Sequence, residues 1–183
     1  MSTKYKIRNQ EALHFISFAT VEWVDVFTRP VYKEVIVESL KYCQQNKGMV
    51  LYAWCLMTNH VHMILSSNGS NKQEDIIRDF KKFTSKRYLE LIESNSNKSR
   101  RNWMLWIFKS AGGKNSNNTT YQFWRQDNHP IELDSNKLMD QKLEYIHNNP
   151  VVEGIVDIPE EYLYSSARNY AGRSGLIEVE LIG

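Results

Sequence analysis

Residues 49–67, with the sequence MVLYAWCLMTNHVHMILSS, constrain the fold more than any other part of this 183-residue chain. Two apolar runs of strand length are separated only by a short turn at residues 57–59, which predicts an antiparallel hairpin. Alternation assigns the first strand to two faces, with Val50, Tyr52, Trp54 and Leu56 on one and Leu51, Ala53 and Cys55 on the other. Because both faces are apolar, we expect a central strand that is covered on both sides.

The second strand of this hairpin carries two histidines on one side. Side chains alternate across a strand, so His60 and His62 share a face with Ile64, while the intervening apolar residues point the other way. Two neutral imidazoles at this spacing can bind one metal ion. The alternative is a pair of histidines packed against a covering helix with their nitrogens hydrogen-bonded, and the pair alone leaves both interpretations open.

The patterns on either side of the hairpin indicate the fold class. Residues 13–20 predict a strand, and helices are expected over about Pro30 to Asn46, residues 72–94 and residues 134–149, the last ending before Pro150. Residues 95–102 are expected to form a polar loop, residues 103–108 fit a short strand or a helix end, and residues 121–133 are expected to be extended. This order predicts an α+β chain with a ferredoxin-like βαββαβ antiparallel sheet and helices packed on it, in one domain spanning residues 1–183.

The last predicted helix places three polar groups along one edge. Its apolar stripe is formed by Met139, Leu143 and Ile146, and at 100° per residue the groups that flank this stripe are Lys142, Tyr145 and Asn149. If this helix packs across the histidine face of the sheet, the phenol, the amide and the ammonium meet the two imidazoles. Asn149 would then be a third metal ligand, and Tyr145 would lie beside the metal.

These groups suit an attack on a phosphodiester. A tyrosine hydroxyl has a pKa of about 10, so neighbouring positive charge such as that of Lys142 is needed to favour the phenolate. A divalent cation would polarise the phosphate, and the mixed nitrogen and oxygen ligands suit Mg²⁺ or Mn²⁺ better than structural zinc. The alternative for Tyr145 is a half-buried tyrosine at the edge of a helix.

A local basic segment indicates a nucleic-acid partner. Between Lys72 and Arg101 there are nine Lys/Arg and five Asp/Glu, although the formal charge of the whole chain is only +2. The residues expected to contact DNA are Lys81, Lys82, Lys86, Arg87, Arg100, Arg101, Trp124 and Arg125. A solvated helix face for the cations, and core packing for Trp124 and its aromatic neighbours, are the alternatives. The two cysteines fit no metal spacing and no apolar run is long enough to span a membrane, so we expect a cytoplasmic protein.

Two segments together resemble a known family. WCLMTNHVHMIL and LEYIHNNPVVEGIVDIPEEYLYSSARNY, in this order, resemble the REP-associated tyrosine transposases, which belong to the single-tyrosine transposases of the HUH superfamily. The resemblance runs from about Leu13 to Tyr170. It implies a ferredoxin-like sheet with the tyrosine helix on the histidine face, metal binding by His60 and His62, and Tyr145 as the nucleophile. Asn149 matches the amide that is a ligand candidate in the family.

The resemblance also implies an activity, which is metal-dependent cleavage and rejoining of single-stranded DNA, often at a hairpin, through a 5′-phosphotyrosine intermediate. Thr58 departs from the proline that is frequent before the Asn-His pair, and we expect this change to alter the turn but not the ligands. Two alternatives stay open, a hairpin-binding protein without cleavage and a metal-dependent nucleotide hydrolase, although Glu144, a possible general base, points away from Tyr145. The chain can be a monomer or a homodimer, and its DNA site is not evident from the sequence.

Overall fold

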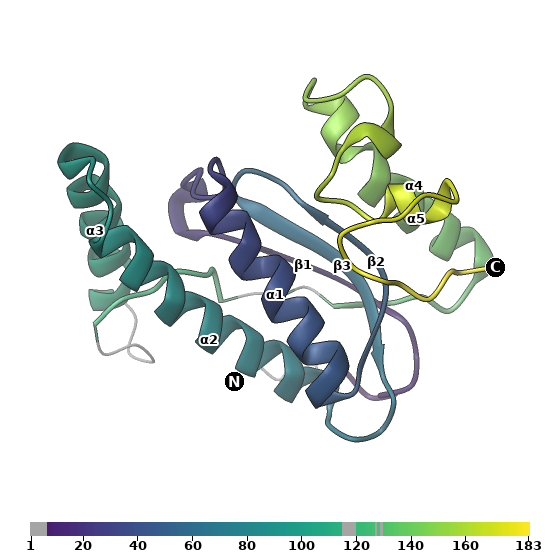
Figure 1. Ribbon diagram of the computed structural model, residues 1–183. Coiled ribbons are helices and arrows are strands. Elements are labelled where there is room, and N and C mark those ends of the chain that lie inside the picture. The colour runs from purple at the N-terminus through teal and green to yellow at the C-terminus, as the bar shows by residue number, and fades with distance from the viewer. Residues whose placement is uncertain (1–6, 115–119, 127, 129) are drawn as a thin grey trace.

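A four-stranded antiparallel sheet with the strand order β2-β3-β1-β4 lies at the centre of the molecule (Figure 1). The computed structural model describes residues 7–114, 120–126, 128 and 130–183. The strands are β1 (His14–Ala19), β2 (Met49–Leu56), β3 (His60–Ser67) and the short β4 (Ile131–Glu132). With the helices between them, they form the predicted ferredoxin-like α+β fold, so that prediction is confirmed.

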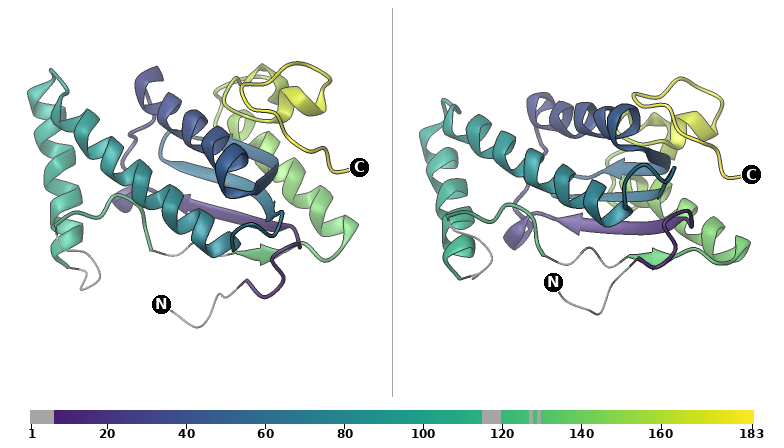
Figure 2. Two further views of the ribbon diagram at one scale, coloured as in Figure 1. Left: turned by 60° about the horizontal axis from the view of Figure 1, so that its bottom comes forward. Right: turned by 90° about the horizontal axis from the view of Figure 1, so that it is seen from below.

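Two helices cover one face of the sheet. Helices α1 (Pro30–Lys47) and α2 (Gln73–Glu93) lie side by side there (Figures 1 and 2). The main core forms beneath them, and it includes Val61, Met63 and Leu65 from the side of β3 opposite His62. The predicted boundaries of α1 and α2 are close to the observed ones. Amphipathic patterns of this length indicate which residues of a helix are buried.

The other face of the sheet is covered by α4 (Asn136–Val152) and by the chain that follows it (Figure 1). A second, smaller core forms here and includes Phe15, Ala53, Ile64 and Ile146. The tyrosine-bearing helix therefore lies on the histidine face, as predicted. The remaining helical segments are η2 (Val21–Trp23), α3 (Lys98–Gly113), η3 (Pro159–Glu161) and α5 (Ala167–Tyr170).

The chain after α4 closes the free edge of β2. The Leu56 N–H donates to the Tyr164 carbonyl and the Ser166 N–H donates to the Trp54 carbonyl, both at 2.9 Å. Cys55 and Ser165 form an isolated antiparallel bridge between these bonds. Because these bonds continue the ladder of the sheet, the tail protects an edge that would otherwise expose unpaired backbone groups.

Three local predictions were wrong. A bulge near Tyr52 shifts the register of β2, so Leu51 packs into the main core with Trp54 instead of facing away from it. Residues 98–102, predicted as a loop, lie in α3 together with residues 103–108, and an Asn97 side chain that accepts from the Arg100 N–H caps the helix start. Helix α4 continues through the buried Pro150 to Val152, because a proline this near the end disturbs only the last turn.

Candidate active site on the histidine face

The two histidines of β3 form the floor of the candidate site. The ring centroids of His60 and His62 lie 4.7 Å apart, with the planes at 74°. His62 is only 5% exposed, and neither of its ring nitrogens has a hydrogen-bond partner. Buried polar nitrogens are rarely left without a hydrogen bond, so the two ring nitrogens of His62 indicate a site that binds a ligand.

Tyr145 projects from α4 toward this floor. Its ring centroid is 5.1 Å from that of His62 and 6.0 Å from that of Phe15, which stacks on His62 from β1. The next residue, Ile146, is fully buried in the second core and fixes the rotation of the helix. The Tyr145 ring therefore contacts the His62 imidazole. Because Tyr145 is 49% exposed, it is also accessible to a large ligand.

The other two groups on the predicted helix edge also reach the site. The Lys142 Nζ lies 4.8 Å from the Phe15 ring centroid and 5.7 Å from that of Tyr145. The Asn149 side chain lies near enough to His60 to raise the pKa of that imidazole, and its Nδ2 donates to the Tyr145 carbonyl at 3.0 Å. The structure therefore brings together all five residues of the predicted centre, within a single chain.

The environment keeps both imidazoles neutral. Burial, together with the smaller effects of the charges of His60 and Lys142, lowers the pKa of His62 to about 3. Burial also lowers the pKa of His60, an effect opposed by the neighbouring Asn149 amide and by the Glu153 carboxylate. A neutral imidazole offers a nitrogen lone pair, which is the form that binds a metal.

The donor set fits a metal ion with open coordination positions. In the described part of the chain no three His, Cys, Asp or Glu side chains come together in the geometry of a metal site. The Asn149 amide, water or a phosphate would supply further oxygen ligands. Such a set suits Mg²⁺ or Mn²⁺, which keep several exchangeable ligands, and does not suit a closed structural zinc site.

The basic residues of α2 do not converge on the histidines. Helix α2 lies on the opposite face of the sheet, so the exposed Lys82, Lys86 and Arg87 are separated from His60 by the main core. Lys81 instead ties α2 to the segment before β4, since its Nζ donates at 2.7 Å to the Arg125 carbonyl. A DNA strand at the candidate site would have to pass around the sheet edge to meet these cations.

Of the three other arginines predicted to contact DNA, two are accessible and one is bonded within the protein. The Arg100 guanidinium donates to the Asp25 backbone carbonyl at 2.7 Å and to its carboxylate at 3.1 Å, and Arg101 is partly exposed. Arg125 is exposed and lies 5.3 Å from the ring centroid of Trp23. Arg101 and Arg125 therefore remain accessible to a ligand, whereas Arg100 is engaged within the protein.

The structure does not support the predicted DNA contact of Trp124. Trp124 is 4% exposed, its indole N–H donates to the Thr84 hydroxyl at 2.9 Å, and its ring lies 4.8 Å from that of Phe18. A ring enclosed in this way cannot stack on a base, because both faces are already packed. The core interpretation holds for Trp124 and for the adjacent Phe123.

Several residues near the histidines have no distinctive sequence signal. Trp23, 53% exposed, places its ring centroid 5.8 Å from that of His60, and the Asn59 Oδ1 lies 2.6 Å from the His60 Nδ1. Glu153 is the acidic residue whose charge acts on His60. Only Asn59 could have been suspected, from its place directly before the histidine pair.

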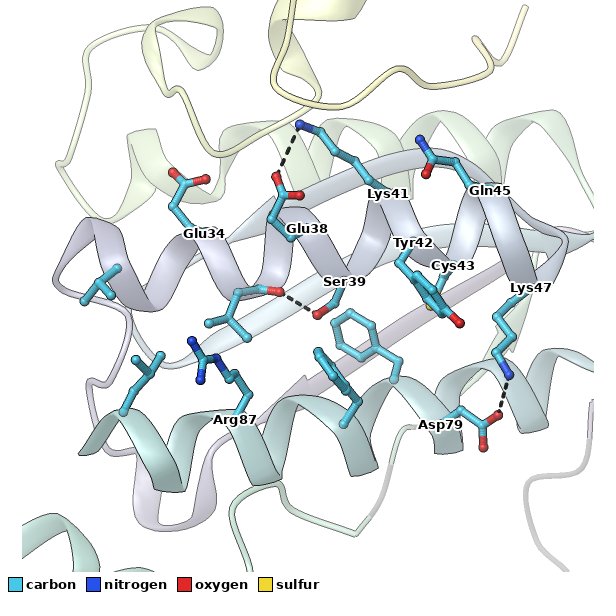
Figure 3. Close-up of a pocket in the computed structure, with 15 residues that line it drawn as sticks. Glu34, Glu38, Ser39, Lys41, Tyr42, Cys43, Gln45, Lys47, Asp79 and Arg87 are labelled. Atoms are coloured by element: carbon cyan, nitrogen blue, oxygen red, sulfur yellow. Dashed lines mark hydrogen bonds and ion pairs between the residues drawn. The ribbon is translucent and has the colours of Figure 1, made fainter. Parts of the chain in front are cut away.

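A groove between α1 and α2 lies on the far side of the sheet from this site (Figure 3). Its volume is about 950 Å³, and its lining includes Val31, Tyr42, Phe83 and Arg87. Large pockets often mark active sites, but this one contains no residue of the histidine centre. The histidine centre and this groove are therefore on opposite faces of the sheet.

Known proteins resemble the chain in sequence and in fold. A family model described as "Transposase IS200 like" matches residues 9–123, which include both histidines of β3 and end before Tyr145. A solved structure of a REP-associated tyrosine transposase bound to a REP hairpin superposes with a TM-score of 0.64 at 13% identity, covering 100% of this chain and 94% of the other. A proposed transposase from Deinococcus radiodurans R1 gives a TM-score of 0.48 at 17% identity, covering 81% and 95%. No curated protein matches the sequence.

Proposed function

Since this chain belongs to the IS200-like transposase family, we propose that it cleaves and rejoins single-stranded DNA through a covalent bond to Tyr145. The observation that carries the proposal is the approach of the half-exposed Tyr145 ring to 5.1 Å from the buried His62 ring. A phenol held beside two neutral imidazoles, and still open to a large substrate, is arranged for nucleophilic attack.

In the proposed reaction the Tyr145 hydroxyl oxygen attacks the phosphorus of the scissile phosphodiester. A tyrosyl oxygen–phosphorus bond forms, the bond from phosphorus to the 3′ oxygen breaks, and the proton lost by the phenol is matched by one gained at that 3′ oxygen. The ammonium of Lys142, 5.7 Å from the Tyr145 ring centroid, favours the negative charge that develops on the phenol oxygen. The ester keeps the energy of the broken bond, so a 3′ hydroxyl can reverse the step without ATP.

His60, His62 and Asn149 would hold the divalent metal, Mg²⁺ or Mn²⁺. When bound, it would polarise the scissile phosphate and neutralise charge in the transition state. All three protein ligands are neutral, so the phosphate is the natural source of the negative charge that a dication requires. The ammonium of Lys142 beside the phenol suits a phosphate and not a cationic substrate, and Glu153 near His60 partly offsets this charge.

The substrate class we propose is single-stranded DNA with a hairpin. The structure of similar fold, the REP-associated tyrosine transposase, was solved bound to a REP hairpin. The accessible cations that remain as contact candidates are Lys82, Lys86, Arg87, Arg101 and Arg125. Since the tyrosine and the histidines meet within one chain, we also propose that one subunit forms a complete catalytic centre.

An adduct assay tests the proposal. Hairpin-bearing oligonucleotides labelled at the 3′ end are incubated with the protein and Mn²⁺ and resolved on a denaturing gel. We expect a labelled protein–DNA adduct that is absent in Tyr145→Phe, because the substitution removes only the nucleophilic oxygen. Tyr42→Phe is the matched control, since Tyr42 is similarly exposed on α1 at 55% but lies on the opposite face of the sheet.

Other outcomes would identify a different function. An adduct that persists in Tyr145→Phe would overturn the assignment of the nucleophile. Release of free nucleotide without an adduct would indicate the hydrolase alternative, for which Glu153 near His60 is the available acidic group. Tight, metal-independent hairpin binding without cleavage would indicate a DNA-binding protein.

A further inference from the structure

We propose that Asn59, held by the backbone carbonyl of Trp23, is a positioning residue that sets the tautomer of His60. In this arrangement the His60 Nδ1 carries the proton, which leaves the Nε2 lone pair available as a metal ligand. The role of this tautomer in metal binding rests on the proposed function, but the tautomer itself can be measured without any DNA.

The Trp23 carbonyl is presented by an unusual turn. Glu22 and Trp23 have φ values of 51° and 53°, and in the described part of the chain they are the two non-glycine residues with positive φ. Two consecutive left-handed residues, one of them bulky, are disfavoured and persist only where other contacts impose them. Here the Trp23 N–H donates to the Thr20 carbonyl at 3.2 Å, and the Val21 N–H donates to the Phe123 carbonyl at 2.9 Å.

The same turn is bonded directly to the start of β3. The Thr20 N–H donates to the Asn59 carbonyl at 2.9 Å, and the Phe27 N–H donates to the Thr58 carbonyl at 2.9 Å. The backbone of Asn59 is therefore fixed relative to Trp23 before its side chain is considered.

The chemistry of the amide then determines the orientation of the Asn59 side chain. A backbone carbonyl can only accept, so the Asn59 atom that lies 3.1 Å from the Trp23 oxygen must be the Nδ2 donor. The Oδ1 consequently faces the His60 Nδ1 at 2.6 Å. This oxygen has no proton to give, so the Nδ1 must be the donor and must carry the hydrogen.

The opposite arrangement of the amide is excluded by the same reasoning. It would set the Oδ1 against the Trp23 carbonyl, leaving two acceptors in contact. The Trp23 ring, whose centroid is 5.8 Å from that of His60, also restricts rotation of the imidazole about its own axis. A neutral imidazole protonated at Nδ1 has one lone pair, and that lone pair is on Nε2.

His60 and His62 therefore differ in how they are prepared for a metal. His62 has no hydrogen-bond partner on either nitrogen, so nothing in the protein selects its tautomer. His60 is preset by a chain of two hydrogen bonds that begins at the strained turn. Residues that hydrogen-bond to a metal-binding histidine orient its ring, and their removal typically lowers metal affinity by 10–100-fold.

Nitrogen-15 NMR of the histidine side chains tests the inference in the full-length, metal-free protein at pH 8, where the imidazoles are neutral. We expect His60 to show the Nδ1–H tautomer in the wild type and to lose this selection in Asn59→Ala. Mn²⁺ affinity, measured by titration calorimetry, should fall by about 10–100-fold in the same variant.

Asn46→Ala is the matched control, because the Asn46 Nδ2 also donates to a backbone carbonyl at 3.1 Å but lies on α1, away from the histidines. A wild-type His60 protonated at Nε2 would overturn the inference, as would unchanged tautomer and Mn²⁺ affinity in Asn59→Ala. If Asn59→Ala does not fold, the wild-type spectrum alone decides. Failure of the adduct assay with the expected tautomer would count against the proposed function and not against the role of Asn59.

Discussion

The anchoring of the tyrosine helix by His147 gives a prediction that can be worked out from the structure. His147 lies on α4 between Tyr145 and Asn149, and its Nε2 is 2.9 Å from the Ser166 hydroxyl oxygen. Ser166 in turn accepts from the Trp54 N–H of β2 at 3.0 Å. The imidazole thus joins α4 to the tail that closes the sheet edge, and burial lowers its pKa from 6.5 to about 4.

The sign of the pH effect follows from this depressed pKa. Below pH 6.5 the unfolded chain binds a proton at His147 that the folded chain does not bind until about pH 4. Stability is therefore full above pH 6.5 and falls as the pH drops toward 4. With these pKa values the loss attributable to His147 at pH 5 is about 2 kcal/mol, and it approaches ~3 kcal/mol below pH 4.

Urea unfolding at pH 7.5 and pH 5.0 measures this loss in the wild type and in His147→Gln, with a chelator present so that metal binding does not contribute. We expect the free energy of unfolding of the wild type to fall by about 2 kcal/mol more than that of the variant. His60 and His62, whose pKa values are also lowered, affect both proteins equally and cancel in the comparison. Equal losses in the two proteins would refute the reasoning.

Further predictions concern the candidate site and its surroundings. A mixture of Tyr145→Phe and His62→Ala proteins should form no more adduct than the single variants, because the two residues meet within one chain; restored activity would indicate exchange of the helix between subunits. Removal of metal by a chelator should abolish the adduct, and calorimetry should show Mn²⁺ binding more tightly in the presence of hairpin DNA, since the protein ligands are neutral. Lys142→Met should slow adduct formation on the order of tenfold without changing DNA affinity in a filter-binding assay, because only charge near the phenol is removed. Trp124→Phe should lower the free energy of unfolding by about 1–3 kcal/mol and leave DNA affinity unchanged, because its indole is buried on Thr84; weaker DNA binding with unchanged stability would contradict the core assignment.

The family match and the geometry support different parts of the proposed centre. The matched residues 9–123 include His60 and His62 but not Tyr145 or Asn149. The place of the latter two depends on the helical spacing of α4 and on its packing against the sheet. The adduct assay with Tyr145→Phe is therefore the experiment that bears on the part of the site that the family match does not reach.

Local patterns in the sequence determined much of this fold. The hairpin of β2 and β3, the extent of α1 and the common edge of Lys142, Tyr145 and Asn149 follow from periodicity, which depends only on neighbours along the chain. The same reasoning did not detect the bulge near Tyr52 or the continuation of α4 through Pro150. These features depend on how one element fits against another.

Tertiary structure alone decided which side of the sheet each element covers. Nothing in the spacing of α2 shows that its lysines lie across the core from His60, and nothing in the composition distinguishes the buried Trp124 from the exposed Trp23. The turn at Glu22, with its link through Asn59 to His60, exists only because bonds from residues far along the chain hold it in place. Sequence patterns report the faces of single helices and strands, whereas long-range packing determines which of those faces meet.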